Sequence, residues 1–221
     1  MIFDVAGLLA LAASCAPSVA PETLIAIVHT ESRFDSLAIG INSAGVRNPA
    51  AISKAQAVAS ARRLMRQGYN IDLGLGQINS ANLAWLGLSV EDAFEPCPNL
   101  AAAARVMATN YQAVVRTSSS REQAIATALS LYNTGDRRRG FRNGYVARVY
   151  ASAAAVIPQI RGRATTMLMA QKPSVDPMPT AAKRPNSAPV TASAWATEAA
   201  AQKASLMVFG DLATFEKGQN P

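Results

Sequence analysis

The chain has 221 residues, 50% of them hydrophobic and 16% charged, which allows one domain of about 150 residues and a further segment. No stretch reaches the roughly 18 uninterrupted apolar residues of a membrane-spanning helix, so a polytopic membrane protein is excluded. Two cysteines and one histidine cannot build a zinc finger or a histidine-based metal cluster, and we expect neither a metal nor a cofactor. The net charge of +7 favours an anionic partner without choosing between nucleic acid, lipid and an acidic polymer.

Residues 1–13 allow more than one interpretation. They are apolar and short, like the hydrophobic core of a signal peptide, but a basic start is missing and Asp4 interrupts them. The alternative is that Phe3, Leu8 and their apolar neighbours belong to the first helix of the folded domain. The residues before Cys15 also resemble a lipoprotein cleavage site to a small degree, so the sequence leaves the export route open.

Two helices are predicted in the first 70 residues. One begins at Pro21, and the other ends at Gly68. Their apolar residues recur at helical spacing: Leu24, Ile27 and Val28, then Ala57, Val58, Ala61, Leu64 and Met65. Between them, residues 39–46 carry the only strand pattern, which predicts at most a short β-hairpin.

Three further helices are predicted before residue 158. Asn99 is predicted as the N-cap of one helix, and Ser120 opens a capping box for the next, which Gly135 ends. The last is predicted over residues 145–157, because Pro158 follows. The fold class is therefore mostly α.

The composition changes beyond Pro158. Between residues 173 and 189, five prolines fall among serine, threonine, alanine and lysine, and the apolar residues beyond Pro158 show no sustained period. Such a segment cannot bury enough apolar surface to offset the entropy of ordering. We therefore predict a folded domain over residues 1–158 and a flexible, disordered tail over residues 159–221.

Glu31 stands out on physical grounds. It continues the apolar stripe of Leu24, Ile27 and Val28, so the helix directs this carboxyl group towards the core side. Burial there raises the pKa of a carboxyl group, which is the property of a general acid that cleaves a glycosidic bond. The competing interpretation is an ordinary glutamate paired with Arg33 at a helix end.

The neighbours of Glu31 suggest no further catalytic group. His29 lies about 200° from Glu31 around a helix, so it is interpreted as a packing or surface histidine. Asp35 falls at the helix end, where a turn residue is the simpler interpretation. The pattern gives no other obvious second carboxylate.

A glycine-rich turn covers residues 74–79. It lacks the Lys-Ser/Thr ending of a P-loop and the third glycine of a dinucleotide-binding fingerprint. We interpret these glycines as allowing a ligand to approach the backbone closely, with the amides of Gln77 and Asn79 free to bind it.

Four motifs together closely resemble the lysozyme-like lytic transglycosylases. They are, in chain order, Glu31-Ser32-Arg33-Phe34, Gly74-Leu75-Gly76-Gln77-Ile78-Asn79, Leu131-Tyr132-Asn133-Thr134-Gly135 and Gly144-Tyr145-Val146. Three segments resemble the subgroup that serves type IV secretion systems: Cys15-Ala16-Pro17, Ser32-Arg33-Phe34 and Glu95-Pro96-Cys97-Pro98-Asn99-Leu100. The resemblance covers roughly residues 8–158, and the opening Leu131 departs from the alanine that is common in the family.

The resemblance implies a goose-lysozyme-like α domain with a groove for peptidoglycan glycan strands. Glu31 is then the sole catalytic acid/base. The residues implied to bind substrate around it are Ser32, Gln77, Asn79, Tyr132, Asn133 and Tyr145. In such enzymes the acid protonates the oxygen between MurNAc and GlcNAc, and the same carboxylate then takes the proton of the MurNAc C6 hydroxyl, which leaves a 1,6-anhydroMurNAc end.

The resemblance also implies a location and partners. The substrate lies outside the cytoplasm, so we expect a periplasmic protein in which Cys15 and Cys97 form a disulfide. The expected partners are peptidoglycan and other components of a type IV secretion system, reached through the tail, with no nucleic acid and no stable membrane insertion.

Two alternatives from other classes stay open. A peptidoglycan-binding scaffold of the secretion channel with little or no catalysis fits the long tail, but pure binding needs no carboxyl group on an apolar face. A nucleic-acid-binding protein fits the charge, but the chain lacks a Lys/Arg stripe with interleaved aromatic residues.

Overall fold

The computed structural model describes the backbone of residues 1–170 and the side chains of residues 1–158. Met1–Ile160 belong to one compact unit. The predicted flexible tail lies outside the described residues from position 171 onwards.

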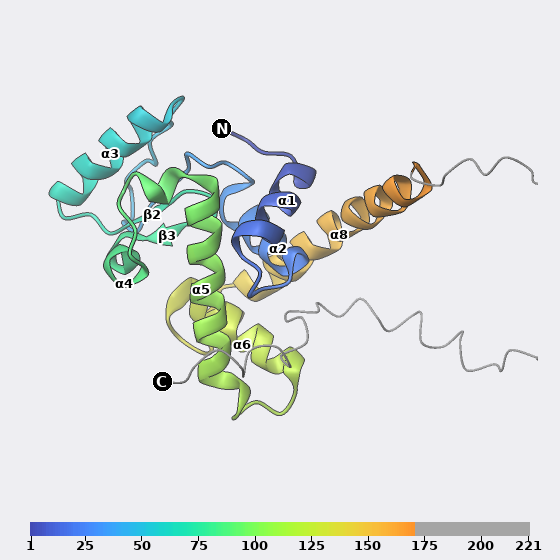
Figure 1. Cartoon of the computed structure of the whole chain (residues 1–221). Helices are drawn as coiled ribbons and strands as arrows, with labels where there is room; N and C mark the ends of the chain where they lie inside the picture. The colour runs from blue at the N-terminus through green and yellow to red at the C-terminus, as the bar shows by residue number, and fades with distance from the viewer. Residues whose placement is uncertain (171–221) are drawn as a thin grey trace, which may run out of the picture. The chain divides into compact units, whose positions relative to one another are not determined.

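This unit is mostly helical, as predicted (Figure 1). The helices described over residues 1–170 are α1 (Val5–Cys15), α2 (Pro21–Ser32), α3 (Lys54–Arg66), α4 (Leu83–Leu86), α5 (Pro96–Val115), α6 (Arg121–Thr134), α7 (Arg139–Arg142) and α8 (Tyr145–Ala170), with short 3₁₀ turns η1 (Ser80–Asn82) and η2 (Asp92–Phe94). Helix α5 contacts α1, α2, α6, η2 and the strand β3 (Ile78–Asn79), so it is the element around which the unit is organised.

The N-terminal residues form the first helix of the domain. The side chain of Asp4 caps α1 by accepting a hydrogen bond from the backbone N–H of Gly7 at 2.8 Å. Leu8 and Ala12 are fully buried in the core. Of the interpretations of this segment, the structure therefore supports the one in which it belongs to the fold.

The helix-end patterns are mostly confirmed. Helix α2 begins at Pro21, and α6 begins after Ser120, whose hydroxyl accepts from the N–H of Gln123 at 3.1 Å. Gly135 ends α6 in the left-handed conformation, with φ of 66°. These local patterns need only the residues of one turn, so the sequence predicts them well.

Two predicted helix ends are wrong. Helix α5 begins at Pro96, and Asn99 is a buried residue inside its first turns, not the N-cap. Pro96 and Pro98 suit this first turn because the N–H that proline lacks has no partner there. Helix α8 continues through Pro158 to Ala170, because an internal proline removes one hydrogen bond and kinks a helix without having to end it.

The β structure is larger than the predicted hairpin. Strand β1 (Ile39–Ile41) pairs antiparallel with β2 (Ile71–Leu73), which pairs antiparallel with β3 (Ile78–Asn79). Ile71 and Leu73 face the core, so the residue between them faces the opposite side. Strands of two or three residues are too short to show a period in the sequence, which is why the second and third were missed.

The predicted disulfide is present. Cys15 at the end of α1 and Cys97 in the first turn of α5 are bonded, with their Cα atoms 5.4 Å apart. The bridge joins residues 82 positions apart and fixes the first helix to the central helix.

Replacing both cysteines by serine should reduce the free energy of unfolding by about 4 to 5 kcal/mol in the chain-entropy model, because the loop that the bridge closes is long. Urea denaturation of the double variant and of the parent protein measures this difference. Reduction of the parent by dithiothreitol is the matched control and should cause the same loss. Equal urea midpoints for all three samples would contradict the prediction.

Candidate active site

A cleft of about 590 Å³ lies beside the sheet, and most of its lining is polar. Its walls come from α2, β2, β3, η1, α4, α5, α6, α7 and the segment before α8. The lining residues are Glu31, Asn42, Asp72, Gln77, Ile78, Asn79, Asn82, Trp85, Val106, Asn110, Leu131, Tyr132, Asn133, Thr134, Gly135, Arg139 and Asn143. Of the residues that the sequence implicated, five line this cleft: Glu31, Gln77, Asn79, Tyr132 and Asn133.

Glu31 reaches the cleft from the last turn of α2. The stripe before it, Leu24, Ile27 and Val28, is completely buried and fixes the helix against the core. Arg33 then adopts the left-handed conformation, with φ of 54°, and ends the helix. The packing of α2 thus sets the direction of the carboxyl group, as its position in the apolar stripe predicts.

Burial raises the pKa of Glu31 to about 7. The hydrogen bond from Tyr145 opposes this rise, the negative charge of Asp72 adds to it, and the positive charge of Arg148 opposes it. The predicted rise is confirmed, and at neutral pH a large fraction of Glu31 carries a proton that it can donate.

Tyr145 is the direct partner of Glu31. Its hydroxyl donates a hydrogen bond of 2.5 Å to Oε1 of Glu31, and its ring is buried at the start of α8. Burial raises the pKa of Tyr145 well above its usual value, with the charge of Glu31 adding to the effect. Tyr145 therefore stays a hydrogen-bond donor over the range in which Glu31 titrates.

Tyr132 supports the glycine-rich turn in the wall of the cleft. Its hydroxyl donates to the carbonyl oxygen of Gly76 at 2.7 Å, so it holds the glycine-rich turn from α6. Burial also raises the pKa of Tyr132 well above its usual value. Both tyrosines that the family resemblance implied therefore keep their hydroxyl protons and donate them in hydrogen bonds within the protein.

The glycine-rich turn is held from the other side by Asn99. The side-chain oxygen of Asn99 accepts from the N–H of Gly76 at 2.7 Å, and its amide donates to the carbonyl oxygens of Leu73 and Ala93. A Cβ atom at Gly76 would lie 2.8 Å from Cβ of Ala103 on α5. The glycines of this turn thus allow close approach to α5 and Tyr132, whereas the sequence suggested approach to a ligand.

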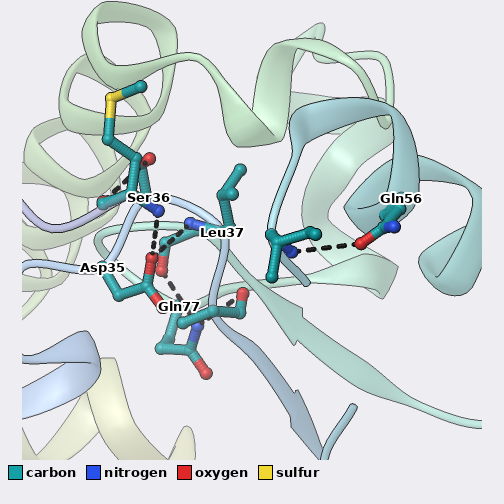
Figure 2. A network of polar contacts seen from close by, with 9 residues as sticks. Asp35, Ser36, Leu37, Gln56 and Gln77 are labelled. Carbon is teal, nitrogen blue, oxygen red and sulfur yellow. Dashed lines mark hydrogen bonds and ion pairs between the residues drawn. The ribbon is translucent and has the colours of Figure 1, made fainter. Parts of the chain in front are cut away.

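Gln77 and Asn79 are not free, in contrast to the prediction. Figure 2 shows Gln77 in the polar network beside Asp35 and Leu37; its side-chain amide donates to the carbonyl oxygens of Ala38 at 3.2 Å and Gly74 at 2.9 Å. The amide of Asn79 donates to Asp72 at 2.7 Å. Both residues line the cleft, but these donors already stabilise its wall.

Asp72 is a second carboxylate in the cleft, which the sequence analysis missed. It accepts hydrogen bonds from the side-chain amides of Asn42 at 2.9 Å and Asn79 at 2.7 Å. Burial raises its pKa, and these two hydrogen bonds lower it. The signal that could have found it is the alternation of Ile71, Asp72 and Leu73 before the turn, which directs one polar side chain away from the core.

Three residues near Glu31 lie elsewhere. The hydroxyl of Ser32 donates to the carbonyl oxygen of Val28 in its own helix, and Ser32 does not line the cleft. Nδ1 of His29 lies 2.9 Å from the hydroxyl oxygen of Ser152, which confirms the predicted packing histidine. Asp35 accepts from the N–H of Leu37, which confirms the predicted turn residue.

Over residues 1–170, no helix combines the length and the apolar composition needed to cross a membrane. The part of the chain with described side chains contains no group of three or more metal-ligating residues. The groups that line the cleft include two carboxyl groups, several amides, the hydroxyls of Tyr132 and Thr134 and the guanidinium group of Arg139, and the hydroxyl of Tyr145 contacts Glu31.

The helical unit, the small sheet and a polar cleft lined by a glutamate with a raised pKa fit the lysozyme-like domain that the motifs predict. The chain belongs to the family described as Transglycosylase SLT domain, whose model matches residues 9–152. This confirms the family that the four motifs predicted.

Relatives with similar sequences carry the name virB1. Protein virB1 of Agrobacterium fabrum strain C58 is 40% identical over 152 residues, and protein virB1 of Rhizobium radiobacter is 41% identical over 150 residues. The type IV secretion system protein virB1 of Brucella suis biovar 1 is 37% identical over 166 residues.

The matches cover 69%, 68% and 69% of this chain, in the same order. They cover 61%, 62% and 69% of the relatives, so the chain spans about three fifths of the length of the first two curated relatives. Among solved structures, none matches with significance.

The origin of the raised pKa can be tested by substitution. We expect Glu31 to titrate with a midpoint of about 7. Tyr145→Phe should raise the midpoint, because it removes a donor to the carboxylate, and Asp72→Asn should lower it, because it removes a repelling negative charge. NMR of protein labelled with ¹³C in the glutamate carboxyl groups measures each midpoint.

Asp92→Asn is the matched control for this titration, because it removes the same charge outside the cleft. Its Glu31 midpoint should equal that of the parent protein. A midpoint near 4.5, the ordinary glutamate value, in the parent would contradict the arrangement.

Steric contact at the glycine-rich turn gives a second prediction. Gly74→Ala places Cβ 2.2 Å from the carbonyl oxygen of Ala93 at a φ of 71°, whereas Gly87→Ala has the same φ and no atom within 4 Å. We expect Gly87→Ala to cost about 1 to 2 kcal/mol for the left-handed backbone. Gly74→Ala should cost about 1 to 3 kcal/mol more for the overlap. Chemical denaturation measures both, and equal losses would contradict the close contact.

Proposed function

We propose that this chain is a peptidoglycan lytic transglycosylase. It cleaves the glycosidic bond between MurNAc and GlcNAc and leaves a 1,6-anhydroMurNAc end. The observation that carries the proposal is Glu31, a carboxyl group with a pKa of about 7 that lines a polar cleft and is held by Tyr145. The family of the chain supports the same reaction.

In the first step Glu31 acts as general acid. Its proton goes to the bridging oxygen as the bond to C1 of MurNAc breaks, and GlcNAc leaves with a hydroxyl group. The carboxylate that remains accepts the hydrogen bond of Tyr145, which stabilises the charged form at this moment.

In the second step the same carboxylate acts as base. It removes the proton of the MurNAc C6 hydroxyl as that oxygen attacks C1, so Glu31 returns to its protonated state and no water is consumed. The charge of Asp72 stabilises the positive charge that develops on the sugar ring between the two steps. Both oxygens of Asp72 already accept amide hydrogen bonds, which suits this electrostatic role better than the activation of a water.

The biological setting follows from the relatives. The Brucella suis relative is named as a type IV secretion system protein, and we extend this role to the present chain: it opens the cell wall locally for the assembly of such a system. We place the protein in the periplasm, where its substrate lies. The disulfide supports this location, because such bridges form and persist in oxidising compartments.

The alternative is a binding scaffold of the secretion channel without catalysis. Such a scaffold gains nothing from a buried carboxyl group, which costs stability when it ionises. The raised pKa of Glu31 therefore favours the enzyme.

The decisive variant is Glu31→Gln. The amide has nearly the same shape but cannot donate and take back a proton, so we expect release of anhydro-muropeptides from purified sacculi to fall at least about 10³-fold. Mass spectrometry of the soluble products measures this loss. The thermal melting temperature at pH 8 should equal or exceed that of the parent protein, because the variant has no charge to bury.

The products also distinguish the mechanisms. A parent enzyme that releases muropeptides with reducing MurNAc ends would be a hydrolase, with Asp72 as the base for water. A parent that binds sacculi and releases nothing would be the scaffold. In the proposed enzyme, cleavage falls as the pH rises through the titration of Glu31 at about 7, because the acid must be protonated.

A further inference from the structure

We propose that Trp85 and Asn82, which line the cleft, and Arg105, which contacts the Trp85 ring, form a sugar-binding subsite that favours glycan carrying a carboxylate over uncharged glycan. This inference rests on the proposed function, because it assigns a further part of the cleft that contains Glu31 to the same substrate. Neither the sequence motifs nor the mechanism above uses any of these three residues.

Trp85 is held in place and exposed at the same time. It lies in the short helix α4 between Leu83 and Leu86, whose side chains are buried in the core. Its own side chain is 43% exposed and lines the cleft that contains Glu31. Fixing an indole in this way removes the entropy that a mobile side chain would lose on binding.

The orientation of the indole is also set. Its Nε1–H donates to Oδ1 of Asn82 at 3.0 Å, so the ring cannot turn freely about its side-chain bonds. Asn82 lines the cleft as well, and its amide nitrogen supplies a donor beside the ring. An oriented aromatic surface flanked by an amide is suited to a pyranose, which has an apolar face and hydroxyl groups at its edges.

Arg105 adds a positive charge to this surface. Its Cζ atom lies 5.2 Å from the centre of the Trp85 ring, which is the distance of a cation–π contact. Arg105 takes part in none of the ion pairs found among the described residues. A guanidinium group without an acidic partner next to a sugar platform can pair with a carboxylate of the ligand.

The chemistry of the ligand follows from this pair. Peptidoglycan alternates GlcNAc with MurNAc, and MurNAc carries a lactyl group and stem peptides that end in carboxylates. A chain of uncharged sugars offers the ring stacking alone. Trp85 therefore contributes affinity for any such glycan, and Arg105 distinguishes peptidoglycan from uncharged polymers.

The test uses the full-length chain with Glu31→Gln, which prevents cleavage, and Trp195→Phe, which leaves Trp85 as the only tryptophan. The probes are chitotetraose, which is uncharged, and a GlcNAc–MurNAc tetrasaccharide with its stem peptides. Both should change the emission of Trp85. Calorimetric titration then gives the dissociation constants of the parent and of each variant.

The expected changes differ between the two residues. Trp85→Leu should raise the dissociation constants of both probes about tenfold. Arg105→Gln should weaken only the anionic probe, by about two- to fivefold at low salt. Two matched controls should bind like the parent: Phe141→Leu, which removes a 46% exposed aromatic residue outside the cleft, and Arg116→Gln, which removes the same charge at the far end of α5.

Several results would overturn the subsite. One is unchanged Trp85 emission together with unchanged binding by Trp85→Leu; another is equal weakening of both probes by Arg105→Gln. If Trp85→Leu fails to fold, the dissociation constants of Trp85→Phe and the change in Trp85 emission of the parent test the subsite in its place. If the cleavage-competent chain releases anhydro-muropeptides while Trp85→Leu binds normally, only the subsite is wrong. If that chain neither cleaves nor binds either probe, the proposed function is wrong as well.

Discussion

The side chain of Asn99 is the constraint on which the cleft depends. It is 1% exposed and makes three hydrogen bonds, to Gly76, Leu73 and Ala93, which join the glycine-rich turn and η2 to the central helix. A buried amide is stable only when its donors and acceptors are satisfied, so the turn and the helix must take one relative position. That position places the wall that carries Gln77 and Asp72 opposite the end of α2.

Given this frame, the electrostatics of the cleft follow from how each group is buried. Glu31 stands at the C-terminal end of α2, where the helix dipole also disfavours a negative charge. Asp72 is only partly buried, and two amides stabilise its carboxylate, whereas Glu31 receives one hydroxyl. Two carboxyl groups in one cleft thus differ in their readiness to hold a proton, which separates a proton donor from a fixed charge.

The substrate wall shows a related division. Amide groups of Gln77 and Asn79 are occupied by the protein itself, so they give rigidity to the cleft. Trp85 in the wall and Arg105 against its ring have exposed surface, so new contacts to a glycan are available there. Rigid polar residues and an exposed aromatic surface in the wall of one cleft are consistent with a glycan polymer bound there.

The sequence by itself determined the features that depend on neighbours in the chain: the helical class, the caps at Ser120 and Gly135, and the direction of Glu31 on its apolar stripe. Tertiary structure decided the rest. Asn99 has the composition of a helix cap, yet its role comes from contacts with residues 6 to 26 positions away. Asp72 lines the cleft because β2 pairs with β1 and β3. These strands are too short to show a period in the sequence. Local patterns report the preferences of one turn, while the partners of a buried polar group are chosen by packing.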